Sequence, residues 1–201
     1  MASTTISPKD VSELRTRTGA GMMDCKRALE ESGGDMDKAS ELLRKKGIAK
    51  AEKRAGRVAS QGVVVSYLHH NGQVGALVEL NCETDFVART DDFQQLARDI
   101  ALHVASADPI GVAAEDIPTE LLDRERRIAE EQVAQEGKPE NIRAKIVEGK
   151  IKKFVAERTL TEQPFVKDDK RTVGQLIKEA SGKLGEAISV RRFARFKIGE
   201  L

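Results

Sequence analysis

The chain has 201 residues, of which 39% are hydrophobic and 33% charged, and its 34 Lys and Arg nearly balance its 33 Asp and Glu. This composition is typical of a globular protein with much exposed helix, and it excludes a disordered chain. A net charge of +1 argues against direct nucleic-acid binding, and no apolar run approaches the roughly 20 residues of a membrane helix.

The beginning of the chain and its two cysteines predict the compartment. Residues 1–5 lack the charged and apolar regions of a signal peptide. Cys25 and Cys82 have neither metal-ligand nor redox spacing, as expected for free thiols in a reducing compartment. We therefore expect a cytoplasmic protein without a metal ion or another cofactor.

The first fifty residues predict three short helices. The pair Ser7-Pro8 marks the N-cap and the first position of one helix, which ends at Gly19. The segment 22–32 has apolar residues at helical spacing and stops at a Gly-Gly pair. Asp35 is the expected N-cap of a third helix, which we expect Gly47 to end. Together they predict a compact three-helix module.

A basic stretch from Lys45 to Arg57 follows this module. It could contact RNA, or it could be a solvated helical linker. No aromatic side chain interleaves with the basic ones, so the linker is the favoured interpretation.

From Gln61 the hydrophobic period changes to two, which predicts a β-hairpin over 62–81 with Asn71-Gly72 in its turn. One face of the return strand is apolar, carrying Val74, Ala76, Val78 and Leu80. A strongly amphipathic helix then begins near Asp91, and we expect it to pack on the sheet.

The connection between this hairpin and this helix contains an apolar pair, Phe86-Val87. Connections lie on the surface and often carry function on a rigid scaffold. Phe86 either folds back as a plug over the core or is presented outward, with Asp85, to a partner. The residues alone leave both possibilities open.

Two charged helices are predicted next, from Pro118 to about Glu136 and from Glu140 to about Arg158, joined by Gly137-Lys138-Pro139. Their apolar stripes are thin: Leu121, Leu122, Ile128 and Val133 against Ile142, Ile146, Ile151 and Phe154. Thin stripes amid dense charge predict an antiparallel helical hairpin over 118–158 that protrudes from the body.

The C-terminal part predicts an extended segment from Thr159 to Val166, a short helix capped by Thr172, and a last strand from Ser189 to Ile198. The residues expected to face inward on this strand are Val190, Ala194, Phe196 and Ile198. The strand needs a partner, and the hairpin supplies one. The expected fold class is therefore α+β, a small antiparallel sheet packed by helices.

Two motifs resemble the signatures of bacterial elongation factor Ts. Thr84-Asp85-Phe86-Val87 follows a strand that ends Glu-Leu-Asn-Cys, and residues 18–26 read Thr-Gly-Ala-Gly-Met-Met-Asp-Cys-Lys. The resemblance extends from about Val11 to the last strand. It implies a UBA-like N-terminal domain with its basic linker at 1–55. It also implies a core, dimerisation-type α+β domain at 56–201 that includes the hairpin arm 118–158.

The function that this resemblance implies is guanine nucleotide exchange on elongation factor Tu in translation elongation. The exchange loop, which would insert near the partner's magnesium and phosphate site, comprises Thr84, Asp85, Phe86 and Val87. The N-terminal positions that match family contacts to the partner's nucleotide-binding domain are Arg15, Met22, Met23 and Lys26. The expected partner is elongation factor Tu in its GDP-bound and nucleotide-free states. This chain looks like the short form of the family, which acts as a homodimer.

The two methionines of the second motif are not equivalent. Adjacent residues on a helix point about 100° apart, so we expect Met22 to fill the core and Met23 to be the exposed, adaptable contact.

No Walker loop, HExxH, CxxC or nucleophile elbow occurs in the sequence. We therefore expect a binding protein rather than an enzyme. The competing interpretation is an RNA- or ribosome-associated protein that uses the basic residues 45–57.

Overall fold

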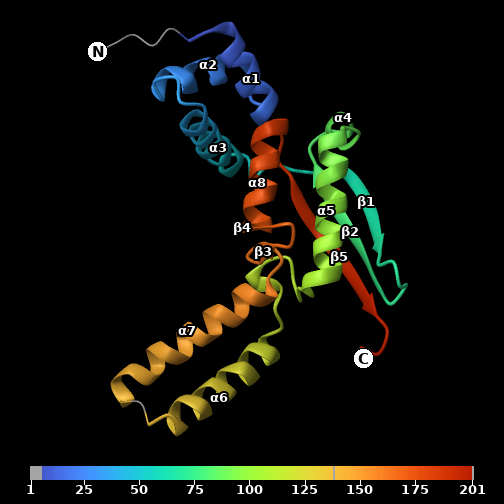
Figure 1. Ribbon diagram of the computed structural model, residues 1–201. Helices are drawn as coiled ribbons and strands as arrows, with labels where there is room; N and C mark the ends of the chain where they lie inside the picture. Colours follow the sequence, from blue (N-terminus) through green and yellow to red (C-terminus); the bar gives the residue numbers. More distant parts are fainter. Residues whose placement is uncertain (1–5, 138, 201) are drawn as a thin grey trace. The chain divides into compact units, whose positions relative to one another are not determined.

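The computed structural model describes residues 6–137 and 139–200 (Figure 1). Its helices and its small three-stranded sheet confirm the α+β class. The described residues separate into two compact units. One is formed by 6–63, 81–96 and 177–189, and the other by 64–80, 97–176 and 190–200.

Three helices form the N-terminal part of the first unit: α1 (Pro8–Thr18), α2 (Met22–Glu31) and α3 (Met36–Glu52). The predicted caps are confirmed. Ser7 and Asp10 form a capping box, Gly19 ends α1 with φ 68°, and the Asp35 side chain accepts from the backbone of α3. The three helices share one apolar cluster, made of Val11, Leu14, Cys25, Ala28, Leu29, Ala39 and Leu43.

The prediction that Gly47 ends α3 is wrong, because α3 continues to Glu52. Gly47 instead lies where α3 meets α8 (Val173–Leu184). A Cβ atom built on Gly182 of α8 would lie 2.8 Å from the Gly47 backbone, closer than side chains tolerate. The two glycines therefore permit a close helix approach, and Gly47 serves packing rather than termination.

The sheet has the strand order β1-β2-β5, with β1 (Gln61–Leu68), β2 (Val74–Cys82) and β5 (Ser189–Lys197). The turn between β1 and β2 contains Gly72 at φ 69°, as predicted. The Ile198 N–H donates to the Gln73 carbonyl, and Arg192 pairs with Glu79, so β5 runs antiparallel to β2. On β2 the predicted apolar face is confirmed, since Ala76, Val78 and Leu80 are buried.

The predicted orientation of β5 is wrong beyond Val190. Phe196 and Ile198 are 68% and 75% exposed, whereas the Arg195 side chain is only 11% exposed. The Arg195 Nε donates to the Ala105 carbonyl oxygen at 3.1 Å, near the end of α5 (Asp91–Ala107). A guanidinium that satisfies a terminal helix carbonyl has to face the helix, and this sets the opposite face of the strand toward solvent.

Helices α6 (Thr119–Gln135) and α7 (Glu140–Arg158) follow a 3-10 turn, Ala114–Asp116, and lie side by side in Figure 1. Their joint carries the predicted residues 137–139, of which Lys138 lies outside the described part. The hairpin has its own apolar cluster, Ala129, Val133, Val147 and Ile151. Ile128 and Ile142 were expected in it but are 41% and 39% exposed, and Ala129 and Val147 occupy the buried positions instead.

The segment after α7 is a turn rather than the predicted extended stretch. Gln163 N–H bonds back to the Thr159 carbonyl, and strand structure begins only at β3 (Pro164–Phe165), which pairs with β4 (Asp168–Thr172). Gln163 holds this turn through its side chain, which bonds the Glu157 carbonyl and the buried His103 ring. Thr172 caps α8 as predicted, its hydroxyl accepting from the Gln175 N–H.

Candidate functional site

The motif between β2 and α5 forms a single helical turn, α4 (Asp85–Ala88). Thr84 is its N-cap, and the Thr84 hydroxyl accepts from the Val87 N–H at 3.4 Å. Ala88 points inward and is buried, whereas Phe86 is 78% exposed. The possibility that Phe86 is a core plug is therefore wrong, and the ring is presented to solvent.

Asp85 directly precedes Phe86 in the sequence. Its carboxylate pairs with Arg89, one helical turn later, at 2.8 Å. Both side chains are well exposed, so the pair contributes little to stability and can exchange partners readily. Arg89 was not among the predicted residues, although its spacing of four from Asp85 was a readable signal.

The N-terminal end of this turn is held by Glu186, from a segment far along the chain. The Glu186 carboxylate accepts from the Glu83 N–H at 3.1 Å and the Thr84 N–H at 3.0 Å, and also from the Thr84 hydroxyl at 2.6 Å. The Cys82 thiol donates to the Thr84 carbonyl at 3.1 Å. Burial and the nearby Glu186 raise the pKa of Cys82, which keeps the thiol protonated as a donor. Nothing in the sequence pointed to Glu186, because it lies about a hundred residues from the turn.

The four N-terminal candidates lie on α1 and α2. Arg15, Met23 and Lys26 are exposed, as expected. Met22 is also exposed, at 53% against 64% for Met23, so its predicted core position is wrong. Cys25, Ala28 and Leu29 fill the buried stripe of α2 and leave both methionines outside it. Lys26 is three and four positions from the methionines, which places the three side chains on neighbouring parts of one helix surface.

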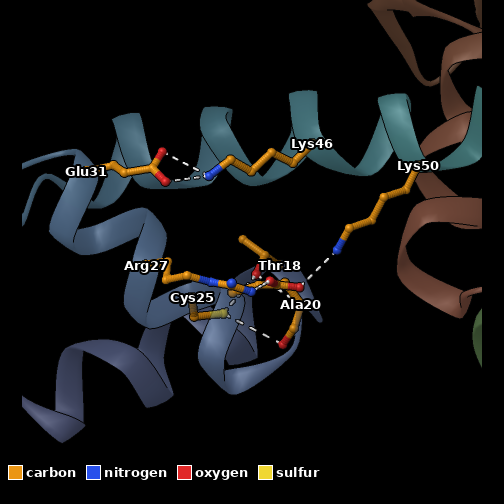
Figure 2. A network of polar contacts seen from close by, with 8 residues as sticks. Thr18, Ala20, Cys25, Arg27, Glu31, Lys46 and Lys50 are labelled. Carbon is orange, nitrogen blue, oxygen red and sulfur yellow. Dashed lines mark hydrogen bonds and ion pairs between the residues drawn. The ribbon is translucent and has the colours of Figure 1, made fainter.

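A polar network lies next to these residues (Figure 2). Lys50 of α3 reaches Asp24 at 3.1 Å, and Lys46 reaches Glu31 at 2.7 Å. Hydrogen bonds from Lys50 and then Arg27 hold the pKa of Asp24 below its usual value, so the carboxylate stays charged. The lysines of the basic stretch are thus partly neutralised within the chain.

The described residues contain no group of three or more His, Cys, Asp and Glu side chains that could hold a metal ion. Within the same residues, no helix combines the length and the apolar character that crossing a bilayer requires.

Comparison with known proteins identifies the class. A family model described as elongation factor TS matches residues 34–200. The elongation factor Ts of Carboxydothermus hydrogenoformans is 55% identical over 195 residues, covering 97% of this chain and 90% of that protein. That of Desulfosudis oleivorans is 54% identical over 196 residues, covering 98% and 99%. That of Thermosipho melanesiensis is 54% identical over 195 residues, covering 97% and 100%.

These similarities place the chain among the translation elongation factors. It belongs to the elongation factor Ts family. Proteins of this family are guanine nucleotide exchange factors for elongation factor Tu, and this is the function of the chain. It therefore changes the nucleotide affinity of a partner, and it is not a catalytic enzyme in the usual sense.

Proposed function

We propose that the chain releases GDP from elongation factor Tu by inserting the Thr84–Val87 turn beside the partner's magnesium and phosphate site. In this proposal Phe86 is the wedge, and Asp85 is the charge that holds neighbouring groups aside. The observation that carries the proposal is the exposure of Phe86 on a turn that is anchored at its base. An aromatic ring with most of its surface in water gains hydrophobic free energy when a partner covers it.

The exchange follows from linkage between two ligands of the partner. The inserted turn weakens the magnesium-bridged contacts that retain the diphosphate. By reciprocity, GDP weakens the binding of the factor to the same extent. The chain therefore binds the GDP-bound state and prefers the nucleotide-free state, after which GTP can rebind.

The test is the release of a fluorescent GDP analogue from purified elongation factor Tu, measured over a series of concentrations of this chain. The plateau rate reports the exchange step, and the half-saturating concentration reports docking. A plateau well above spontaneous release is expected. No acceleration at any concentration would remove the proposal.

The N-terminal domain, residues 1–55, is proposed as a UBA-like second contact tethered to the core domain 56–201. Its support is the separate apolar cluster of α1 to α3 and the exposed side chains of Arg15, Met22, Met23 and Lys26. A tethered contact raises the effective concentration of the exchange loop. Replacing Met22 and Met23 by Glu should raise the half-saturating concentration more than it lowers the plateau. A lower plateau with unchanged half-saturation would contradict this role.

Homodimerisation is proposed through the exposed face of the sheet. That face carries Val64, Leu68, Leu77, Phe196 and Ile198, each 46% exposed or more. Leu68 also lies near Gly75, where an added Cβ would be 3.5 Å from its methyl group. Two such faces can pack as a sandwich about 10 Å thick.

We propose further that the hairpin 118–158 is a protruding arm that packs on itself, and that the chain works in the cytoplasm.

The RNA-binding alternative has weaker support. Lys46, Lys50 and Arg57 of the basic stretch pair with acidic side chains of the same chain. Binding to RNA would fall steeply with added salt. Salt-sensitive RNA binding by a chain that fails to release GDP would favour this alternative.

A further inference from the structure

Two glutamates exchange hydrogen bonds across the base of the exchange turn. The Glu186 carboxylate accepts from the backbone of Glu83 and Thr84, as described above. In return, the Glu83 carboxylate accepts from the Ala187 N–H at 2.7 Å, with Arg57 beside it at 3.4 Å. The Ala187 N–H and then the Arg57 charge hold the pKa of Glu83 below its usual value. Both carboxylates thus act as acceptors for backbone N–H groups of the opposite segment.

This exchange occurs where the turn most needs support. Helix α4 has four residues, and an isolated helix of that length is unstable because nucleation costs more than one turn returns. Its buried contact is Ala88, which is small. The direction of the turn is therefore set mainly at its N-cap, and Glu186 bonds both the backbone and the hydroxyl of the N-cap residue Thr84.

Glu186 is itself held in place. It follows Gly185, whose φ of 82° reverses the chain after α8. The Ser181 hydroxyl of α8 donates to the Glu186 carbonyl at 2.5 Å. Its backbone is therefore bonded to the end of a helix, and from this position its half-buried carboxylate accepts from Glu83 and Thr84.

We propose that Glu186 is a positioning residue for nucleotide exchange, holding α4 so that Phe86 enters the partner without first being ordered. This inference rests on the proposed insertion of the Thr84–Val87 turn. Glu186 touches neither partner nor nucleotide in this role. Ordering a loose loop during binding consumes interaction free energy, and a loop held beforehand avoids that cost.

The role predicts a specific kinetic signature. Docking through the N-terminal contact does not involve Glu186, so the half-saturating concentration should change little when it is replaced. Insertion depends on the aim of the turn, so the plateau rate of GDP release should fall. If Glu186 had a purely structural role, its replacement would lower the melting temperature. It would not lower the plateau rate while leaving the half-saturating concentration unchanged.

Three replacements of Glu186 weaken its hydrogen bonds to Glu83 and Thr84 to different extents. Glu186→Ala removes every acceptor and should lower the plateau about tenfold or more. Glu186→Asp withdraws the carboxylate by one methylene and should give a smaller decrease. Glu186→Gln should come within about threefold of the unchanged chain, since its carbonyl can accept from both N–H groups and its amide can donate to Thr84. The matched control is Glu52→Ala, which removes an exposed ion pair to Lys178 in the same unit and should alter neither parameter.

A second measurement in the free chain does not depend on the partner. Amide hydrogen exchange at Thr84 and Val87 should accelerate in Glu186→Ala and stay near its original rate in Glu186→Gln. A folded Glu186→Ala chain with the original plateau would overturn the proposal, and so would a Glu186→Asp chain with the original plateau if the alanine variant does not fold. If the unchanged chain releases no GDP, the proposed function itself fails, which the variants would not alter.

Discussion

At the scale of single residues, the exposure of Phe86 is the feature on which the proposed contact with the partner depends. The ring is 78% exposed in the free chain, although most aromatic side chains bury the larger part of their surface. Its neighbour Asp85 balances its charge within the same turn by pairing with Arg89. The turn thus presents an apolar group and a charge that are both available to a partner.

Replacing Phe86 by Ala should slow stimulated GDP release by roughly tens-fold, because buried aromatic anchors in interfaces commonly contribute about 2 kcal/mol or more. The melting temperature should hardly change, since exposed substitutions usually alter stability by less than about 0.5 kcal/mol. Asp85→Asn should give a smaller loss of release. Ile142→Ala, at an exposed apolar position of the hairpin, is the control. Unchanged GDP release by Phe86→Ala would contradict the proposed role of Phe86 as the inserted wedge.

His103 predicts a pH dependence of stability. The ring is fully buried, and it accepts the Val166 N–H at Nδ1 while bonding Gln163 at Nε2. Burial lowers the pKa of His103 in the folded chain, against a smaller opposing effect of the Gln163 bond. The contribution of the neutral His103 ring to stability is therefore fully present above the unfolded pKa of about 6.5, and it is lost as the pH falls from that value through the folded pKa.

Denaturant unfolding at pH 7.5, 6.5 and 5.5 tests this dependence. His103→Gln should be less stable at pH 7.5, because its bonds are imperfect replacements, and its stability should fall less toward pH 5.5. Parallel profiles for His103→Gln and the unchanged chain would contradict the assignment.

At the scale of elements, the α6–α7 hairpin is self-contained. Its apolar cluster comes from its own two helices, and Arg126 pairs with Glu148 across them. Removing about seven residues, or two turns, from each helix next to the joint should leave GDP release within about twofold. Circular dichroism would confirm that the shortened chain folds. A collapse of release in a folded chain would make the hairpin a primary contact of the partner.

The sequence predicted most elements because local signals decide them. Ser7, Gly19, Asp35 and Thr172 act through bonds within a few residues, so caps and boundaries near them were correct. Gly47 misled the prediction because its role depends on Gly182, far along the chain. The predicted directions of the Arg195 and Phe196 side chains were reversed for a similar reason. The hydrogen-bond acceptor of Arg195 is a carbonyl on α5, far along the chain.

The candidate site divides in the same way. Residues 84–87 and the exposed Met23 were readable from the motifs. The exposure of Met22 and Phe86 required the structure, because periodicity alone does not tell which face of a short helix finds a neighbour. Glu186 escaped prediction entirely, as its bonds connect segments about a hundred residues apart.

At the scale of the whole molecule, the uncovered sheet face predicts association. Phe196→Asp should shift the chain from dimer to monomer in light scattering, because a carboxylate buried in a sandwich interface lacks a partner. Val58→Asp is the matched control, since Val58 is 83% exposed and lies outside the sheet. A monomer mass for the unchanged chain at micromolar concentration, with full exchange activity, would count against the dimer.

The bonds between Thr84 and Glu186 span 102 positions of the sequence. A nascent chain emerges at about 5–20 residues per second, so residue 84 precedes residue 186 by roughly 5–20 seconds. During that interval the sheet also lacks β5, and α4 has no acceptor at its base. The Thr84–Val87 turn therefore gains the bonds that fix its N-cap only after residue 186 has been synthesised. A chain that ends before residue 186 would carry the Phe86 motif without the Glu186 bonds that, in the proposed role, hold the turn.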